Sequence, residues 1–185
     1  MTREQLEHLI RAAADIANDD EIVVIGSQAI LGQFPDAPAS MRVSMEADLF
    51  PLNHPERTDV IDGSIGELSP FHETFGYYAH GVGEETACLP HGWRQRLVVV
   101  RNENTRGVKG LCLEAHDLIV AKAIAGREKD LLFLEDAARH RMVEAETLLR
   151  RLDTVEADPA ALRNARAMIE RAFARPEDSL TSDVF

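Results

Sequence analysis

The chain has 185 residues, and its 32 Asp and Glu side chains outnumber 20 Lys and Arg, which gives a formal net charge of −12. This charge opposes non-specific binding to nucleic acid, and a hydrophobic content of 45% excludes an intrinsically disordered chain. Two cysteines exclude a disulfide scaffold and a four-cysteine zinc site. No apolar run approaches the roughly 18 residues that span a bilayer, and the acidic N-terminus lacks the pattern of a secretory signal. We therefore expect a cytoplasmic protein with no membrane partner.

The length favours a single domain over residues 1–185. We divide it into an α/β core over about 20–113, a helical part over 114–175 and a frayed tail over 176–185. Charge is uneven, because residues 1–90 hold 16 acidic and 4 basic side chains whereas residues 91–130 hold 8 basic and 5 acidic ones. The basic stretch is either a solvated, salt-bridged surface or a pocket wall for phosphates that faces metal-binding acids.

Hydrophobic periodicity predicts a first helix that Thr2 caps and that ends before Asn18. The elements expected next are a buried strand over 21–25, a short helix over 28–31, a second strand over 41–50 and an interrupted helix over 55–68. Residues 69–92, rich in Gly, His and aromatic side chains, match no periodic pattern.

The second half of the chain begins with a strand over 97–100 and a short strand within 107–113. Helices follow over 114–126, over 129–142 and from Asp158-Pro159 onward. In the second of these helices we expect five apolar side chains to point inward: Leu131, Leu132, Leu134, Ala137 and Ala138. Strands first and helices last predict an α+β fold, a small mixed β-sheet with packed helices and a helical C-terminal part.

Gly26-Ser27 directly follows the first strand and opens the short helix. Glycine lets a ligand approach the backbone closely, and the free N–H groups at a helix start suit a phosphate. The alternative is an ordinary strand-to-helix turn without a ligand.

An acid pair, Glu46 and Asp48, lies in the second strand. Side chains alternate along a strand, so both carboxylates share one face while Met45, Ala47 and Leu49 face the core. Two adjacent carboxylates repel each other unless a cation lies between them, and Mg²⁺ prefers such oxygen ligands. The alternative is an exposed acidic edge in water.

Lys122 falls among the apolar residues Leu118, Ile119 and Ile124 of the first C-terminal helix. A lysine in this position either extends its amine to solvent or has a counter-ion. A nucleoside triphosphate or a group of carboxylates would supply that counter-ion.

These three features occur in a recognisable order. The strand followed by Gly-Ser, the acid-x-acid strand and the pattern Asp-Leu-x-x-x-Lys-x-x-x-Gly-Arg-x-Lys-Asp over 117–130 resemble the nucleotidyltransferase superfamily. Within it, the chain is most similar to uncharacterised bacterial nucleotidyltransferase-like proteins related to the AbiEii/MenT toxins. The resemblance covers about residues 20–142.

The resemblance implies Mg²⁺-dependent transfer of a nucleoside monophosphate from a nucleoside triphosphate (NTP) to an acceptor, either RNA or protein. It also implies the toxin role in a toxin–antitoxin pair, with an antitoxin protein as partner. The implied catalytic residues are Glu46, Asp48, Lys122 and Asp130, of which Glu46 and Asp48 ligate Mg²⁺; the implied nucleotide-binding residues are Gly26, Ser27, Arg127 and Lys129.

The chain departs from the superfamily pattern in two ways. Glu46 replaces the more usual Asp, and the expected third carboxylate is missing from the strand around 96–101. Glu84, Glu85 and Glu103 are the possible substitutes. The alternative function is therefore a catalytically inactive nucleotide-binding or protein-interaction module of the same fold, and a purely structural subunit is a third.

Two weaker signals lie in the unassigned segment. Cys88-x-x-His91 has half of a zinc-site spacing but no clear second half. His72, His80 and His91 accompany several aromatic residues, which favours a loop packed over the sheet or a wall for a base or acceptor.

Overall fold

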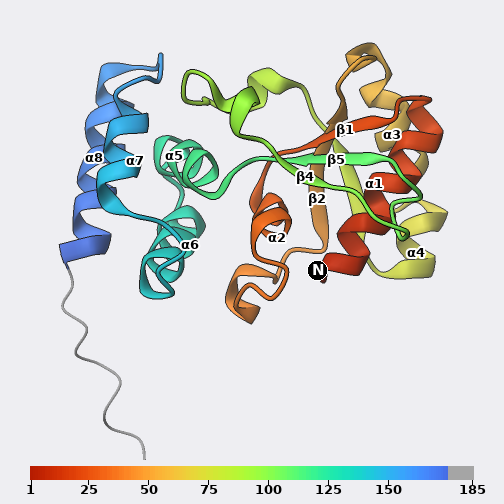
Figure 1. Cartoon of the computed structure of the whole chain (residues 1–185), viewed down its shortest axis with the longest axis horizontal. Helices are drawn as coiled ribbons and strands as arrows, with labels where there is room; N and C mark the ends of the chain where they lie inside the picture. The colour runs from red at the N-terminus through yellow and green to blue at the C-terminus, as the bar shows by residue number, and fades with distance from the viewer. Residues whose placement is uncertain (175–185) are drawn as a thin grey trace, which may run out of the picture.

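The computed structural model describes residues 1–174 of the chain (Figure 1). Its centre is a five-stranded mixed sheet with the strand order β3-β2-β1-β5-β4. The strands are β1 (Glu21–Val24), β2 (Glu46–Pro51), β3 (Tyr78–Gly81), β4 (Val98–Val100) and β5 (Lys109–Cys112). β1 pairs antiparallel with β2 and parallel with β5, while β2 and β3 are parallel. This sheet confirms the predicted α+β fold.

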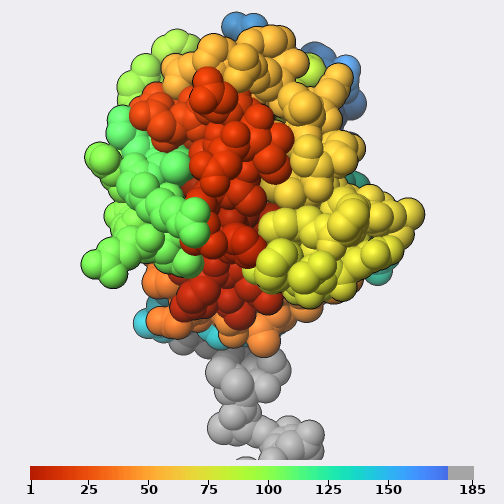
Figure 2. All heavy atoms as spheres, turned by 90° about the vertical axis from the view of Figure 1, so that its right-hand side faces the viewer, coloured from red at the N-terminus to blue at the C-terminus, as the bar shows by residue number. Residues whose placement is uncertain are grey.

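Helix α1 (Arg3–Ala17) forms as its sequence predicts. The Thr2 hydroxyl accepts a hydrogen bond from the Gln5 amide, the Gln5 side chain returns one, and Asn18 ends the helix in the left-handed conformation. Its buried residues recur at helical spacing and pack on the sheet: Leu6, Leu9, Ile10, Ala13 and Ala17. Figure 2 shows α1 between the turn that joins β4 to β5 and the segment around α4 (Pro70–Phe75).

Apart from the short α2, the remaining helices divide between the two ends of the sheet. Helices α3 (Thr58–Ile65) and α4 lie with α1 at the right of Figure 1, and the C-terminal helices gather at the left. The latter are α5 (Ala115–Ala125), α6 (Glu128–Arg139), α7 (Ala145–Leu152) and α8 (Pro159–Ala174). The short elements are α2 (Ile30–Gln33) and the 3₁₀ turns η1 (Ser27–Ala29), η2 (Ala39–Met41), η3 (Pro55–Arg57), η4 (Glu84–Thr86) and η5 (Trp93–Arg96).

A buried ion-pair network joins the C-terminal helices to the sheet side of the molecule. Asp117, fully buried in α5, accepts two hydrogen bonds from the Arg96 guanidinium, at 2.8 Å and 3.0 Å. Arg151 of α7 lies 3.0 Å from the same carboxylate and also pairs with Glu114, the N-cap of α5. Moving α7 away from α5 would leave the buried Asp117 and the partly buried Glu114 without the charge of Arg151, which is costly, so these ion pairs hold the two helices together.

Several element boundaries differ from the predictions. The second strand begins at Glu46 rather than at 41, because residues 39–41 form a 3₁₀ turn. The interrupted helix over 55–68 is η3 followed by α3, and the unassigned stretch over 69–92 contains α4 and β3. Helix α7 was not predicted, and Leu132, expected inward, is 58% exposed.

The predicted tail over 176–185 lies outside the described residues. The single-domain division stays a prediction. None of the helices within residues 1–174 has the length and apolar character to cross a membrane.

Candidate functional site

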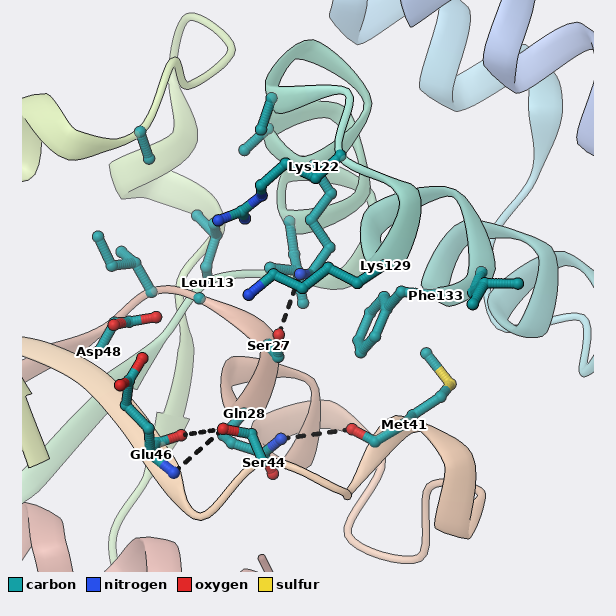
Figure 3. Close-up of a pocket in the computed structure, with 18 of the residues that line it drawn as sticks. Ser27, Gln28, Met41, Ser44, Glu46, Asp48, Leu113, Lys122, Lys129 and Phe133 are labelled. Carbon is teal, nitrogen blue, oxygen red and sulfur yellow. Dashed lines mark hydrogen bonds between the residues drawn. The ribbon is translucent and has the colours of Figure 1, made fainter. Parts of the chain in front are cut away.

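A cavity of about 1000 Å³ opens where β1 and β2 face the C-terminal helices (Figure 3). Seven of the eight predicted site residues line it: Gly26, Ser27, Glu46, Asp48, Lys122, Arg127 and Lys129. The eighth, Asp130, lies buried behind the cavity wall. The sequence motifs therefore come together in space, whereas the chemical role of each residue stays a prediction.

Gly26 packs directly against the Asp48 carboxylate. A Cβ on Gly26 would lie 2.0 Å from Asp48 Oδ2, and its φ of +65° with ψ of −176° is a conformation that only glycine adopts readily. The Ile25 amide donates to the Asp48 carbonyl at 3.0 Å, which holds the two segments together. The glycine is thus required by the close approach of β2.

The helix after Gly26 is too short for its peptide dipoles to attract a phosphate strongly. The predicted helix over 28–31 consists of the 3₁₀ turn η1 and the four-residue α2. A single turn sums few peptide dipoles, so the helix start adds little positive charge to the cavity. Ser27 instead contributes its hydroxyl, which accepts a hydrogen bond from Lys122 Nζ at 3.0 Å.

Glu46 and Asp48 lie on the cavity face of β2, and Ala47 and Leu49 are buried on the other face, as the strand alternation predicts. Met45 does not follow the alternation: it precedes the strand and is 55% exposed. Burial, and then the charge of Glu46, raise the pKa of Asp48, against the opposing effect of His80. The two carboxylates therefore repel each other in a site that a cation would stabilise.

His80 completes a group of three potential metal ligands. It lies on β3 directly beside Asp48, and its Nδ1 is 3.2 Å from Asp48 Oδ1 and 4.0 Å from Glu46 Oε1. One ligand atom from each of the three residues lies within 4.8 Å of the others. Tyr78, two residues earlier, donates its hydroxyl to Glu46 Oε2 at 3.0 Å. The alternation of Tyr78 and His80 about the buried Ala79 is a local signal for this strand, but over four residues it is too short to predict one.

Lys122 enters the cavity from α5 and has the counter-ion that its apolar surroundings require. Its side chain is 7% exposed, and Nζ donates to Asp130 Oδ1 at 3.0 Å as well as to Ser27. The amine also lies 4.6 Å from the centre of the Phe133 ring, a cation–π contact. Burial lowers the pKa of Lys122, and the hydrogen bond to Asp130 partly opposes this effect.

Asp130 is fully buried and holds two cations in place. Its carboxylate accepts hydrogen bonds from Lys122 and from Arg127, the latter with Nε at 2.6 Å. Burial alone would raise the pKa of Asp130, but the hydrogen bonds from Arg127 and Lys122 outweigh it and lower the pKa.

Figure 3 shows the Lys129 side chain extending into the cavity beside Lys122. The acidic wall from β2 thus faces a basic wall from α5 and α6.

No carboxylate lies beside the acid pair on β3. β2 lies between β3 and β1, whereas β4, which corresponds to the strand predicted at 97–100, lies at the opposite edge of the sheet from β3. Glu84, Glu85 and Glu103 do not line the cavity. The residue beside Asp48 on the neighbouring strand is His80.

Two further side chains of the cavity wall stand out. Gln28 is 1% exposed, and its Oε1 has no hydrogen-bond partner among the described residues, although its amide donates to the Met41 carbonyl. Cys88 is exposed at the rim. Within residues 1–174, no group of three potential metal ligands includes Cys88 or His91, so the half zinc motif finds no second half there.

A comparison with protein families agrees with this geometry. A family model described as "Nucleotidyltransferase of unknown function (DUF6036)" matches residues 4–177. No curated protein and no solved structure matches the chain. The matched residues include every strand of the sheet and all residues of the cavity wall named above.

Proposed function

The chain belongs to this nucleotidyltransferase family of unknown function, and on this premise we propose that it transfers a nucleoside monophosphate from an NTP to an acceptor hydroxyl in a Mg²⁺-dependent reaction. One observation carries the proposal. The acid pair of β2, packed against Gly26, faces the buried Lys122–Asp130 pair across a single cavity.

The donor set of the acid pair fits Mg²⁺. Glu46 and Asp48 offer carboxylate oxygens, the hard ligands that Mg²⁺ prefers. Burial raises the pKa of Asp48, and repulsion from the Glu46 carboxylate raises it further. These two residues would hold the ion, which when bound supplies positive charge to the phosphates of the substrate. The Gly26 backbone leaves room beside Asp48 that any Cβ would fill.

The basic wall suits a triphosphate. Lys122 presents a fixed ammonium, while Arg127 and Lys129 are exposed at the cavity and add charge near it. Asp130 does not line the cavity, so we assign it to positioning Lys122 and Arg127 rather than to contact with the substrate. Phosphoryl-transfer enzymes act mainly by positioning the substrate and by stabilising its charge. In the proposed function, Lys122, Arg127 and Lys129 supply the positive charge that binds the triphosphate.

The size and polarity of the cavity also support a nucleotide. Its volume of about 1000 Å³ is at the upper end of the range of roughly 300–1,000 Å³ for ligand pockets. Its wall is also polar, because Ser27, Glu46 and Lys122 line it.

The experiment is transfer of label from NTPs that carry ³²P on the α-phosphate. The full chain is incubated with each NTP, Mg²⁺ and either total RNA or a protein lysate. We expect labelled acceptor with the wild type and none above background with Glu46→Gln or Asp48→Asn. Asp59→Asn, an exposed acid of α3 outside the cavity, is the matched control and should keep full transfer. Transfer that persists in both acid-pair variants contradicts the proposal.

A second candidate function is a catalytically inactive nucleotide-binding or interaction module. The absence of a carboxylate from β3, where His80 lies beside Asp48 instead, favours it. Calorimetry separates the two candidates: the module binds an NTP with Mg²⁺ yet transfers no label to any acceptor.

For the biological role, the resemblance to proteins related to the AbiEii/MenT toxins supports a toxin whose partner is an antitoxin. The acidic residues 1–90 disfavour a large RNA acceptor unless the basic residues 91–130 form the contact face. Induced expression in a bacterial host tests this role: growth should stop with the wild type and continue with Asp48→Asn at equal protein level. Growth that continues with the wild type excludes the toxin role.

A further inference from the structure

His80 occupies a defined position relative to the acid pair. β2 and β3 are parallel neighbours, with Glu46 beside Tyr78 and Asp48 beside His80. Between these pairs, Ala47 and Ala79 are both buried on the opposite face of the sheet. Directly paired residues of neighbouring strands share a face, so the register itself places the imidazole on the cavity side next to both carboxylates.

The distances suit a shared cation. An octahedral ion with ligands at 2.0–2.1 Å places adjacent ligand atoms about 3 Å apart. His80 Nδ1 lies 3.2 Å from Asp48 Oδ1 and 4.0 Å from Glu46 Oε1, so small side-chain rotations bring all three atoms to one face of such an ion. The Tyr78 hydroxyl holds Glu46 from its other oxygen, which leaves Oε1 toward His80.

We propose that His80 is the third protein ligand of the cation held by Glu46 and Asp48, and that it makes this site prefer a transition-metal dication such as Mn²⁺ over Mg²⁺. The inference deepens the proposed function, because it concerns the cation of the same site. Its chemical reason is the donor type: Mg²⁺ binds almost only oxygen ligands, whereas first-row transition-metal dications also accept an imidazole nitrogen.

A purely structural role for His80 makes different predictions. In that role Nδ1–H donates to Asp48 and orients it, and the ring, which is 50% exposed, contributes no ligand atom. Removing His80 would then change the affinity for Mg²⁺ and for Mn²⁺ by the same factor. A ligand role changes mainly the affinity for Mn²⁺.

The test measures cation binding without nucleotide, so its outcome is independent of any transfer reaction. Mn²⁺ is titrated into the full chain and free Mn²⁺ is followed by electron paramagnetic resonance (EPR), with Mg²⁺ as competitor. We expect His80→Ala to weaken Mn²⁺ binding at least about tenfold, since even outer-shell partners of a metal change affinity by 10–100-fold. Its effect on Mg²⁺ should be much smaller. His80→Asp, which supplies an oxygen ligand, should narrow the preference for Mn²⁺ over Mg²⁺.

A spectroscopic readout tests the ligand atom directly. Pulsed EPR of the Mn²⁺ complex should show ¹⁴N coupling in the wild type and none in His80→Ala. His54→Ala is the matched control, because His54 follows the other end of β2 and does not line the cavity; it should keep both the affinity and the coupling. Circular dichroism checks that each variant is folded.

The assignment is overturned by Mn²⁺ binding that is unchanged in His80→Ala, or by binding that is unchanged in Glu46→Gln and Asp48→Asn. A wild type that binds no Mn²⁺ at millimolar concentration overturns it as well. If Mn²⁺ binds as expected but no cation supports label transfer, the proposed transferase activity fails while the ligand assignment holds.

Discussion

Gly26 and the Asp48 carboxylate are in such close contact that the site has no space for any side chain at position 26. A Cβ there would lie 2.0 Å from Asp48 Oδ2 and 2.8 Å from Asp48 Cγ. The contact joins the end of β1 to the middle of β2, and the hydrogen bond from the Ile25 amide to the Asp48 carbonyl reinforces it. The position of the acid pair therefore depends on a residue that offers no functional group of its own.

This contact predicts the effect of Gly26→Ala. The Cβ must displace Asp48, and φ of +65° strains any other residue, so we expect the free energy of unfolding to fall by about 1–3 kcal/mol. Label transfer should fall on the order of 100-fold, because a displacement of about 1 Å at a catalytic group has such an effect. Urea denaturation and the transfer assay measure both.

Gly63→Ala is the matched control for that substitution. Gly63 lies in α3, and an added Cβ would meet no atom within 4 Å, so alanine should leave transfer unchanged and raise stability by up to about 1 kcal/mol through helix propensity. Equal transfer by the Gly26→Ala variant and the wild type would contradict the role of the Gly26–Asp48 contact.

The buried pair of Lys122 and Asp130 predicts an asymmetry between two substitutions. Asp130→Asn leaves the Lys122 ammonium buried without a counter-ion, and we expect a loss of about 3 kcal/mol of unfolding free energy. Lys122→Met leaves Asp130 paired with Arg127, so its loss of stability should be less than half as large. Urea denaturation of the two variants and of the double variant measures the difference.

Substitutions in the same pair distinguish a residue that binds the triphosphate from a residue that only positions the binding side chain. Lys122→Met removes the group that we propose contacts the triphosphate, so NTP affinity measured by calorimetry should fall strongly although the protein is stable. Asp130→Glu, which keeps the charge, should retain part of the affinity. If Lys122→Met destabilises the fold more than Asp130→Asn, the assignment of Asp130 as the shared counter-ion is wrong.

Local sequence signals were sufficient for elements whose stabilising contacts are also local. The Thr2–Gln5 cap and the apolar spacing of Leu6, Leu9 and Ile10 predict α1 because both lie within the helix. The alternation around Ala47 likewise predicts which face of β2 carries the acids. In α6, by contrast, the apolar residues 131–134 are consecutive, so periodicity cannot tell that Leu132 points to solvent.

Long-range pairing decided what the sequence could not predict. β3 has four residues and becomes a strand by pairing with β2, from which it is separated by α3 and α4. The order of strands in a sheet depends on such pairings rather than on chain order, so the sequence alone could not show that β3 lies next to β2 and that β4 lies at the opposite edge. The sequence therefore offers His80 either as part of a loop over the sheet or as a wall for a base or acceptor, and not as the neighbour of Asp48 that the strand pairing makes it.

The Glu114 carboxylate predicts how stability depends on acid pH. Burial opposes its ionisation, but hydrogen bonds from His116 and Arg151 outweigh burial and lower the pKa of Glu114 from 4.5 to about 2. A depressed pKa in the folded state stabilises the protein above the unfolded-state value of 4.5, and this contribution is lost as the pH falls from 4.5 toward 2. Its size is at most about 3 kcal/mol.

Urea denaturation at several pH values between 6 and 3 measures this effect. Glu114→Gln should show a shallower loss of unfolding free energy over that interval, because the side chain no longer titrates. Glu170→Gln, an exposed acid of α8, should keep the slope of the wild type. Equal slopes for Glu114→Gln and the wild type would exclude Glu114 as a source of acid sensitivity.

The two cysteines report on the cavity and on the core separately. Cys88 is exposed at the cavity wall, whereas Cys112 is buried in β5, where burial raises the pKa of its thiol to about 12. A thiol reagent such as Ellman's reagent attacks the thiolate, so we expect one reactive thiol in the native protein and two in urea. Cys88→Ser should abolish the native reaction. Because Cys88 lines the proposed nucleotide site, an NTP with Mg²⁺ should slow its reaction in the wild type, and an unchanged rate at saturating NTP would argue against a nucleotide in this cavity.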